Sequence, residues 1–131
     1  MNVRMLHIYR RIGSQRLQEV KKMKMKKDGN LLAVYLDGEI DHCSAEKIRN
    51  EMEKRLLDQS ITRLALDFSD VSFMDSSGVG MIIGRYKTMT ERSGTVSACG
   101  MHPPVRRVFR MAGLHRIIAE EAAEDGNENE E

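Results

Sequence analysis

The sequence predicts an α/β domain whose sheet is opened by an antiparallel hairpin and continued by crossover connections. Three observations lead to this expectation. Strand-like and helix-like apolar patterns alternate along the chain. A turn sequence, Asp28-Gly29-Asn30, separates the first two strand patterns. The length of 131 residues fits one modest domain with tails and leaves no room for a second domain.

The first two strands form the expected hairpin. Val20, Met23 and Met25 alternate with lysines, which indicates a half-exposed strand before the turn. The second strand, 31–36, is the longest apolar run of the chain. It is far shorter than the roughly 20 residues that cross a bilayer, so we expect a cytoplasmic protein that does not enter the membrane.

The first helix is expected after a polar loop at 37–43. Ser44 is the predicted N-cap, and the helix is expected to end near residue 57. Ile48, Met52 and Leu56 recur at i, i+4 and i+8, which indicates one buried stripe.

The second half of the chain repeats the alternation. The strand at 63–68 has apolar residues on both faces, so we expect it to be central and covered on both sides. A polar hinge at 69–70 is expected before the second helix. The remaining expected elements are a helix with its buried face at 79–89, a strand at 95–99, a helix from Pro103 or Pro104 to 111 that Gly113 ends, and an edge strand at 117–119.

Charge is distributed unevenly, although the total is only +1. Residues 1–27 carry nine Lys or Arg and one Glu, residues 28–118 carry twelve of each sign, and residues 119–131 carry seven acids. The balanced middle argues against nucleic acid as a ligand, because phosphate binding needs a basic patch on a folded face.

The two ends of the chain are expected to lie outside the domain at 20–119. We predict a flexible basic arm at 1–19 and a disordered acidic tail at 120–131, since the tail cannot bury enough apolar surface to order itself. The arm also holds a short amphipathic pattern at 5–12, so an anchoring role for it stays open.

Candidate chemistry is sparse. Cys43 and Cys99 are expected to be free thiols, the four histidines lack metal-ligand spacing, and no cofactor motif is present. Gly80 and Gly84 fall within a helical period, where we expect them to permit close packing rather than to hold a phosphate. Four acids form a cluster if their loops meet, and a catalytic pair and a solvated rim then remain equally open: Asp37, Glu39, Asp41 and Asp75.

Several motifs together carry a family signal. They are Leu36-Asp37-Gly38-Glu39-Ile40-Asp41-His42, Asp67-Phe68, Phe73-Met74-Asp75-Ser76-Ser77-Gly78, Gly84-Arg85-Tyr86-Lys87, Pro104-Val105-Arg106-Arg107-Val108-Phe109 and Gly113-Leu114. In this combination the chain resembles the STAS-domain anti-sigma factor antagonists over about 20–119, and within them the sporulation branch that acts on anti-sigma F factors. The resemblance implies a mixed sheet of four to five strands with three to four helices, and no enzymatic activity of its own.

The resemblance also implies a site and a switch. It nominates Ser76 as the phosphoacceptor and Glu39, Asp41, Asp75, Ser76, Ser77 and Gly78 as the partner-binding residues. The unphosphorylated chain is expected to bind a nucleotide-bound anti-sigma factor with serine kinase activity and so to release the sporulation sigma factor. Phosphorylation switches this off, and a phosphoserine phosphatase reverses it. We expect a monomer without metal or cofactor.

Other interpretations remain open at this stage. Ser76 can instead be only an N-cap, with the acids only a rim. The chain can also be a STAS regulatory module of a stress-signalling or transport-linked system with a different partner. A nucleotide-hydrolysing enzyme is the third alternative, and turnover of ATP or GTP by the purified protein would identify it.

Overall fold

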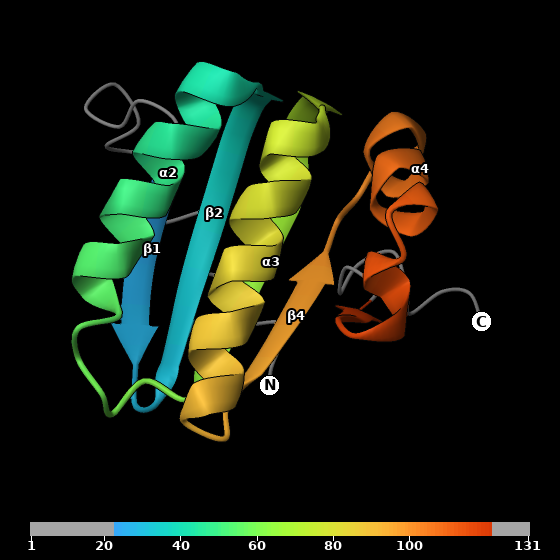
Figure 1. Cartoon of the computed structure of the whole chain (residues 1–131). Helices are drawn as coiled ribbons and strands as arrows, with labels where there is room; N and C mark the ends of the chain where they lie inside the picture. Colours follow the sequence, from blue (N-terminus) through green and yellow to red (C-terminus); the bar gives the residue numbers. More distant parts are fainter. Residues whose placement is uncertain (1–22, 122–131) are drawn as a thin grey trace, which may run out of the picture.

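The computed structural model describes residues 23–121, which form one five-stranded sheet in the order β1-β2-β3-β4-β5 (Figure 1). Within this part of the chain there are three α-helices and one 3₁₀ turn. The elements are β1 (Met23–Asp28), β2 (Leu31–Ile40), α2 (His42–Arg55), β3 (Arg63–Met74), α3 (Ser76–Glu91), β4 (Thr95–Cys99), α4 (Pro103–Met111), η2 (Leu114–Arg116) and β5 (Ala119–Glu121).

The sheet is mixed, as predicted. β1 and β2 pair antiparallel through a connection of two residues, and Gly29 adopts the positive φ of +62° that this tight turn requires. The pairs β2–β3, β3–β4 and β4–β5 are parallel and follow crossover connections. The predicted hairpin and the predicted α/β class are both confirmed.

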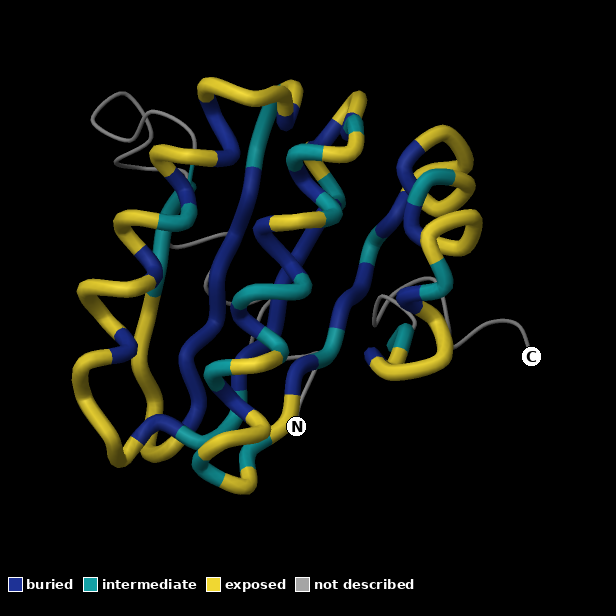
Figure 2. Tube along the Cα trace, viewed as in Figure 1, coloured by how far each residue is buried: buried dark blue, intermediate teal, exposed yellow. Residues whose placement is uncertain are grey.

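The core lies between the sheet and the helices α2 and α3, which run side by side over one face (Figure 1). The predicted stripe of Ile48, Met52 and Leu56 is buried, and β2 runs through the middle of the molecule as a buried strand (Figure 2). β3 is the central strand, and Ala65 on its other face is 1% exposed. Side chains that are completely removed from water, such as Phe68, each contribute about 2 kcal/mol to folding.

Two strands are longer than the sequence indicates. β2 continues past residue 36 to Ile40 and β3 continues past residue 68 to Met74, so the predicted hinge at 69–70 is wrong. The two strands pair with each other beyond the point where β4 ends, and register shifts after Tyr35 and Gly38 accommodate the polar residues there. The last strand begins at Ala119 rather than at residue 117 because η2 and its following turn use the residues before it.

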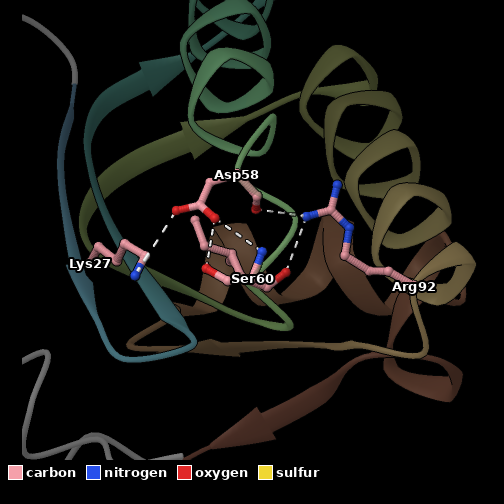
Figure 3. Close-up of polar contacts among 5 residues, drawn as sticks. Lys27, Asp58, Ser60 and Arg92 are labelled. Carbon is pink, nitrogen blue, oxygen red and sulfur yellow. Dashed lines mark hydrogen bonds and ion pairs between the residues drawn. The ribbon is translucent and has the colours of Figure 1, made fainter.

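The lower end of the two helices in Figure 1 is joined by a network of polar contacts (Figure 3). Arg92, at the C-cap of α3, donates to the backbone oxygens of Leu56, Asp58 and Ile61 at 2.8, 3.2 and 3.1 Å. The Asp58 carboxylate accepts from the backbone N–H and the hydroxyl of Ser60. One side chain of α3 therefore satisfies three carbonyl groups at the end of α2 and in the segment after it.

The ends of the chain mostly lie outside the described residues. The predicted arm at 1–19 is entirely outside them, and of the predicted tail at 120–131 only Glu120 and Glu121 are described, as part of β5. Glu120 accepts from Arg106 at 3.1 Å and from Arg110 at 2.9 Å, which ties β5 to α4. Within residues 23–121, no helix is long and apolar enough to span a membrane.

Candidate functional site

The predicted site residues gather where β2 and β3 end. Ile40 and Met74 are register partners at the ends of these parallel strands, and the Asp75 N–H donates to the Ile40 oxygen at 3.1 Å. The next residue of each strand end caps a helix, Asp41 for α2 and Asp75 for α3. Two helix N-termini therefore start side by side at the upper end of the molecule in Figure 1, and the positive ends of both helix dipoles lie there.

Asp41, not Ser44, is the N-cap of α2. Its carboxylate accepts from the Ser44 N–H at 3.0 Å, while the Ser44 hydroxyl oxygen accepts from the Asp41 N–H at 2.9 Å. This reciprocal pair is a capping box. The Ser44 N–H, followed by the Ser44 hydroxyl, holds the pKa of the Asp41 carboxyl below its usual value. The sequence prediction placed the helix start too late because both residues are good N-caps three positions apart.

Asp75 caps α3 and leaves Ser76 exposed. The Asp75 carboxylate accepts from the Ser77 N–H at 2.8 Å, so the interpretation of Ser76 as the N-cap is wrong. Ser76 is the first residue of α3 and lies in solvent, whereas Ser77 is half-buried. The two neighbouring hydroxyls therefore differ in access, and Ser76 is the more accessible one.

The predicted acid cluster forms in part. Asp41 and Asp75 lie together at the helix starts, and each carboxylate is engaged by backbone N–H groups. Glu39 is exposed on β2, and its register partner Phe73 is 45% exposed on β3. Asp37 lies further back along β2. Because the two carboxylates at the helix starts serve as helix caps, the arrangement favours the acidic rim over the catalytic pair.

The glycines of α3 differ from the prediction. Gly78 is buried, and a Cβ there would overlap the Met74 side chain and lie 3.1 Å from Cγ2 of Ile40. Gly78 therefore lets the first turn of α3 sit directly on the ends of β2 and β3. For Gly80 and Gly84, no atom of residues 23–121 outside their chain neighbours and the adjacent helix backbone lies within 4 Å of an added Cβ, so the prediction that they are packing glycines is wrong.

Sequence reasoning missed two features of this end. One is the exposed Phe73, which an apolar residue next to buried strand positions does not distinguish from core. The other is a groove of about 410 Å³ between α2 and α3 that begins at Ser77. Among residues 23–121, no group of His, Cys, Asp and Glu is placed to hold a metal ion. Cys43 is exposed, Cys99 is buried, and no disulfide joins them.

Sequence comparisons place this arrangement among known proteins. The model of the STAS domain family matches residues 22–126. A protein from Paenibacillus polymyxa named anti-sigma F factor antagonist is 34% identical over 96 residues, which cover 73% of this chain and 82% of that protein. A protein from Listeria monocytogenes named anti-sigma-B factor antagonist is 30% identical over 93 residues, which cover 71% and 81%.

Solved structures show the same fold. The anti-sigma factor antagonist SpoIIAA in its unphosphorylated form matches with a TM-score of 0.70 at 28% identity, over 79% of this chain and 91% of that one. The Bacillus cell fate determinant SpoIIAA in its phosphorylated form matches with a TM-score of 0.64 at 27% identity, over 81% and 96%.

Proposed function

The chain belongs to the STAS-domain family, among its anti-sigma factor antagonists, and we propose that phosphorylation of Ser76 controls this antagonism. The unphosphorylated chain binds a nucleotide-bound anti-sigma factor that is also a serine kinase, and the sporulation sigma factor is released. The kinase then phosphorylates Ser76 and ends the interaction, and a phosphoserine phosphatase restores it. The antagonist acts as a cytoplasmic monomer, without nucleic acid, cofactor or catalysis of its own.

The observation that carries this proposal is the exposure of Ser76 at the first position of α3, next to a cap that does not use its hydroxyl. A kinase can reach this hydroxyl without unfolding the helix. A phosphate there carries about −1.5 to −2 charges, and a helix N-terminus favours an anion by roughly 0.3–1 kcal/mol. Within the first turn of α3 itself there is no acidic residue, so the acids nearest in sequence are the N-cap Asp75 and the rim residues outside the helix. The match to SpoIIAA structures of both forms supports a fold that accommodates either state.

The partner surface is proposed to surround this serine. Glu39 and Phe73 are exposed side by side on neighbouring strands, so a cationic and apolar partner surface would fit them. The two helix starts are formed by the caps Asp41 and Asp75 and by Ser77, whose N–H donates to Asp75. Gly78 allows α3 to pack closely against Met74 and Ile40. A phosphate on Ser76 places about two negative charges into this acidic rim. The switch therefore acts on the interface by bulk and charge while the fold stays intact.

A second candidate keeps the site and changes the partner. The Listeria monocytogenes relative is named anti-sigma-B factor antagonist, at an identity close to that of the sigma F relative. The chain would then serve a stress-signalling system through the same serine. Binding measured against the anti-sigma factor encoded beside this gene, and against one of each class, separates the two candidates.

The test uses Ser76 and its neighbour. Ser76→Ala should bind the partner, accept no phosphate and change the unfolding free energy by no more than about 0.5 kcal/mol, since Asp75 is the cap. Ser76→Asp should bind at least tenfold more weakly at an unchanged melting temperature. Ser77→Ala is the matched control and should still be phosphorylated. Mass spectrometry after incubation with the partner kinase and ATP decides the site: phosphate on Ser77, or retained in Ser76→Ala, contradicts the assignment.

A further inference from the structure

Gly80 lies inside α3 at a position where nothing in the described fold requires a glycine. It is exposed, its φ is not positive, and apart from its chain neighbours and the adjacent backbone of α3, no atom of residues 23–121 lies within 4 Å of an added Cβ. Glycine in a helix interior is less favourable than alanine, because it loses more backbone entropy on folding. Glycine at position 80 therefore makes the helix less stable, and no packing contact within the described fold compensates for this loss.

Gly80 forms part of the wall of the groove between α2 and α3. This groove has a volume of about 410 Å³ and begins at Ser77, one residue from the proposed phosphoacceptor. An incoming chain can approach the helix backbone closely at a glycine, because no side chain stands between them. The residues that line the groove are His42, Ala45, Glu46 and Arg49 of α2 with Ser77, Gly80 and Met81 of α3.

A buried arginine provides a second, independent observation in the same helix pair. Arg85 follows the groove residue Met81 by one turn of α3, and its side chain is 5% exposed. Its Nη2 donates to Glu53 of α2 at 2.9 Å. Its Nε and Nη1 are buried and have no hydrogen-bond partner within residues 23–121. Buried donors without acceptors are unfavourable, so these two nitrogens, with three N–H groups between them, point to an acceptor that residues 23–121 do not supply.

Arg49 connects the groove with the buried arginine, because it lines the groove and shares Glu53 with Arg85. The Arg49 side chain is 41% exposed. Its ion pairs with Glu53 and Glu46 are long, at 3.8 and 3.9 Å. Exposed pairs of this kind contribute about 0–1 kcal/mol, so Arg49 can move aside at little cost.

We propose that the groove receives a segment of the anti-sigma factor whose backbone passes over Gly80 and which delivers a carboxylate to Arg85 and Arg49. This inference rests on the proposed function, because the partner is the same protein. It extends the interface from the Ser76 rim along the seam between α2 and α3. A carboxylate fits because it accepts several N–H groups at once and because both arginines already share a single glutamate.

The test compares two glycines that differ in one respect. Gly80→Ala and Gly84→Ala both place a methyl group where no described atom lies within 4 Å, and only Gly80 lines the groove. Both variants should melt higher than the wild type, by about 4 °C, because alanine favours the helix. Gly80→Ala should bind the anti-sigma factor encoded beside this gene at least tenfold more weakly by isothermal titration, whereas Gly84→Ala should bind within twofold of the wild type.

Arg85→Met tests the second half of the proposal. Glu53 is partly solvated and keeps Arg49, so removal of the buried cation should leave the melting temperature equal or higher. Partner binding should fall at least tenfold. Equal binding by wild type and Gly80→Ala, or a lowered melting temperature of Gly80→Ala, overturns the inference and leaves the proposed function standing. A wild-type chain that does not bind the anti-sigma factor contradicts both.

Discussion

The two ends of the α2–α3 pair satisfy their helix termini in opposite ways. At the end where β2 and β3 finish, two short aspartates, Asp41 and Asp75, each accept from the first turn of a helix and reach no further. At the other end, the long side chain of Arg92 crosses from α3 to three backbone oxygens at and beyond the end of α2. The contact with Asp58 is shown in Figure 3. At the first end each helix has its own cap, whereas at the second end one side chain connects the two helices.

Under the proposed function, the Ser76 end binds the partner, whereas the Arg92 end only stabilises the fold. Local caps leave the neighbouring surface unoccupied, which is why Ser76 is accessible and why Phe73 is 45% exposed beside it. The cross-link at Arg92 uses three of its five N–H donors on carbonyls of the same chain. Substitutions at the Arg92 end should therefore change stability alone, and substitutions on the surface at the Ser76 end should change binding.

The largest effect is expected for Arg92→Met. The variant keeps an unbranched side chain but leaves the oxygens of Leu56, Asp58 and Ile61 without their charged donor, so unfolding should become easier by about 2–3 kcal/mol. Binding of the anti-sigma factor by the folded fraction should not change. Urea unfolding at neutral pH measures the first quantity, and titration at a temperature well below the melting point measures the second.

Lys27→Met serves as the matched control at the same end. The Lys27–Asp58 ion pair is 4.0 Å long and solvated on both sides, so its loss should cost no more than about 0.5 kcal/mol. If Lys27→Met were as destabilising as Arg92→Met, positive charge near this end of the helix pair, rather than the three carbonyl contacts of Arg92, would account for its stability.

Gly78→Ala gives a smaller effect and tests whether the Ser76 end also has a structural part. The added methyl group would overlap Met74, which is 1% exposed, and would press on Ile40. Overpacking of this kind costs about 2 kcal/mol, and the better helix propensity of alanine returns about 1 kcal/mol, so the net loss should be about 1 kcal/mol. Thermal unfolding should thus show opposite signs for Gly78→Ala and Gly80→Ala, two positions apart in one helix.

The sequence predicts one of these ends far better than the other. Local patterns suffice for the hairpin at Gly29, the buried stripe of α2 and the run of small polar residues at Ser76. The role of Arg92 depends on a contact with residues 31 to 36 positions earlier in the chain, and no local pattern encodes it. Its position after a helix indicates only a favourable interaction with the C-terminal dipole.

The errors of prediction at the Ser76 end have the same cause. Residues 37–40 and 69–70 are predicted as loop and hinge because most of them are polar, yet β2 and β3 continue there and pair with each other, and the pairing overrides local preference. Spacing alone does not say which glycine of α3 faces the sheet. Gly78 does so because its first turn rests on Met74, whereas Gly80 and Gly84 face away. The direction of a helical face depends on where the helix starts, and that start is set by Asp75 rather than by Ser76.

The smallest effect is a pH dependence shared by both ends. The pKa of Asp41 is lowered by the N–H and hydroxyl of Ser44, and the pKa of Asp58 is lowered by the hydroxyl and N–H of Ser60. A carboxyl whose pKa is lower in the folded state contributes stability that is fully present above its ordinary pKa of 3.8. That contribution is lost as the pH falls through the lowered pKa of the folded protein.

Asparagine variants isolate each contribution, because asparagine accepts the same hydrogen bonds as a neutral group. The difference in unfolding free energy between wild type and Asp41→Asn should be largest at neutral pH and should vanish once the pH lies below the lowered pKa of the folded protein, and likewise for Asp58→Asn. Carboxyls that titrate identically in both chains cancel in the difference. The anti-sigma factor should distinguish the two variants where stability does not: Asp58→Asn should bind like the wild type, whereas Asp41→Asn removes a charge from the proposed interface and should bind more weakly. Equal binding by the two variants would show that Asp41, like Asp58, stabilises the fold without contributing to partner binding.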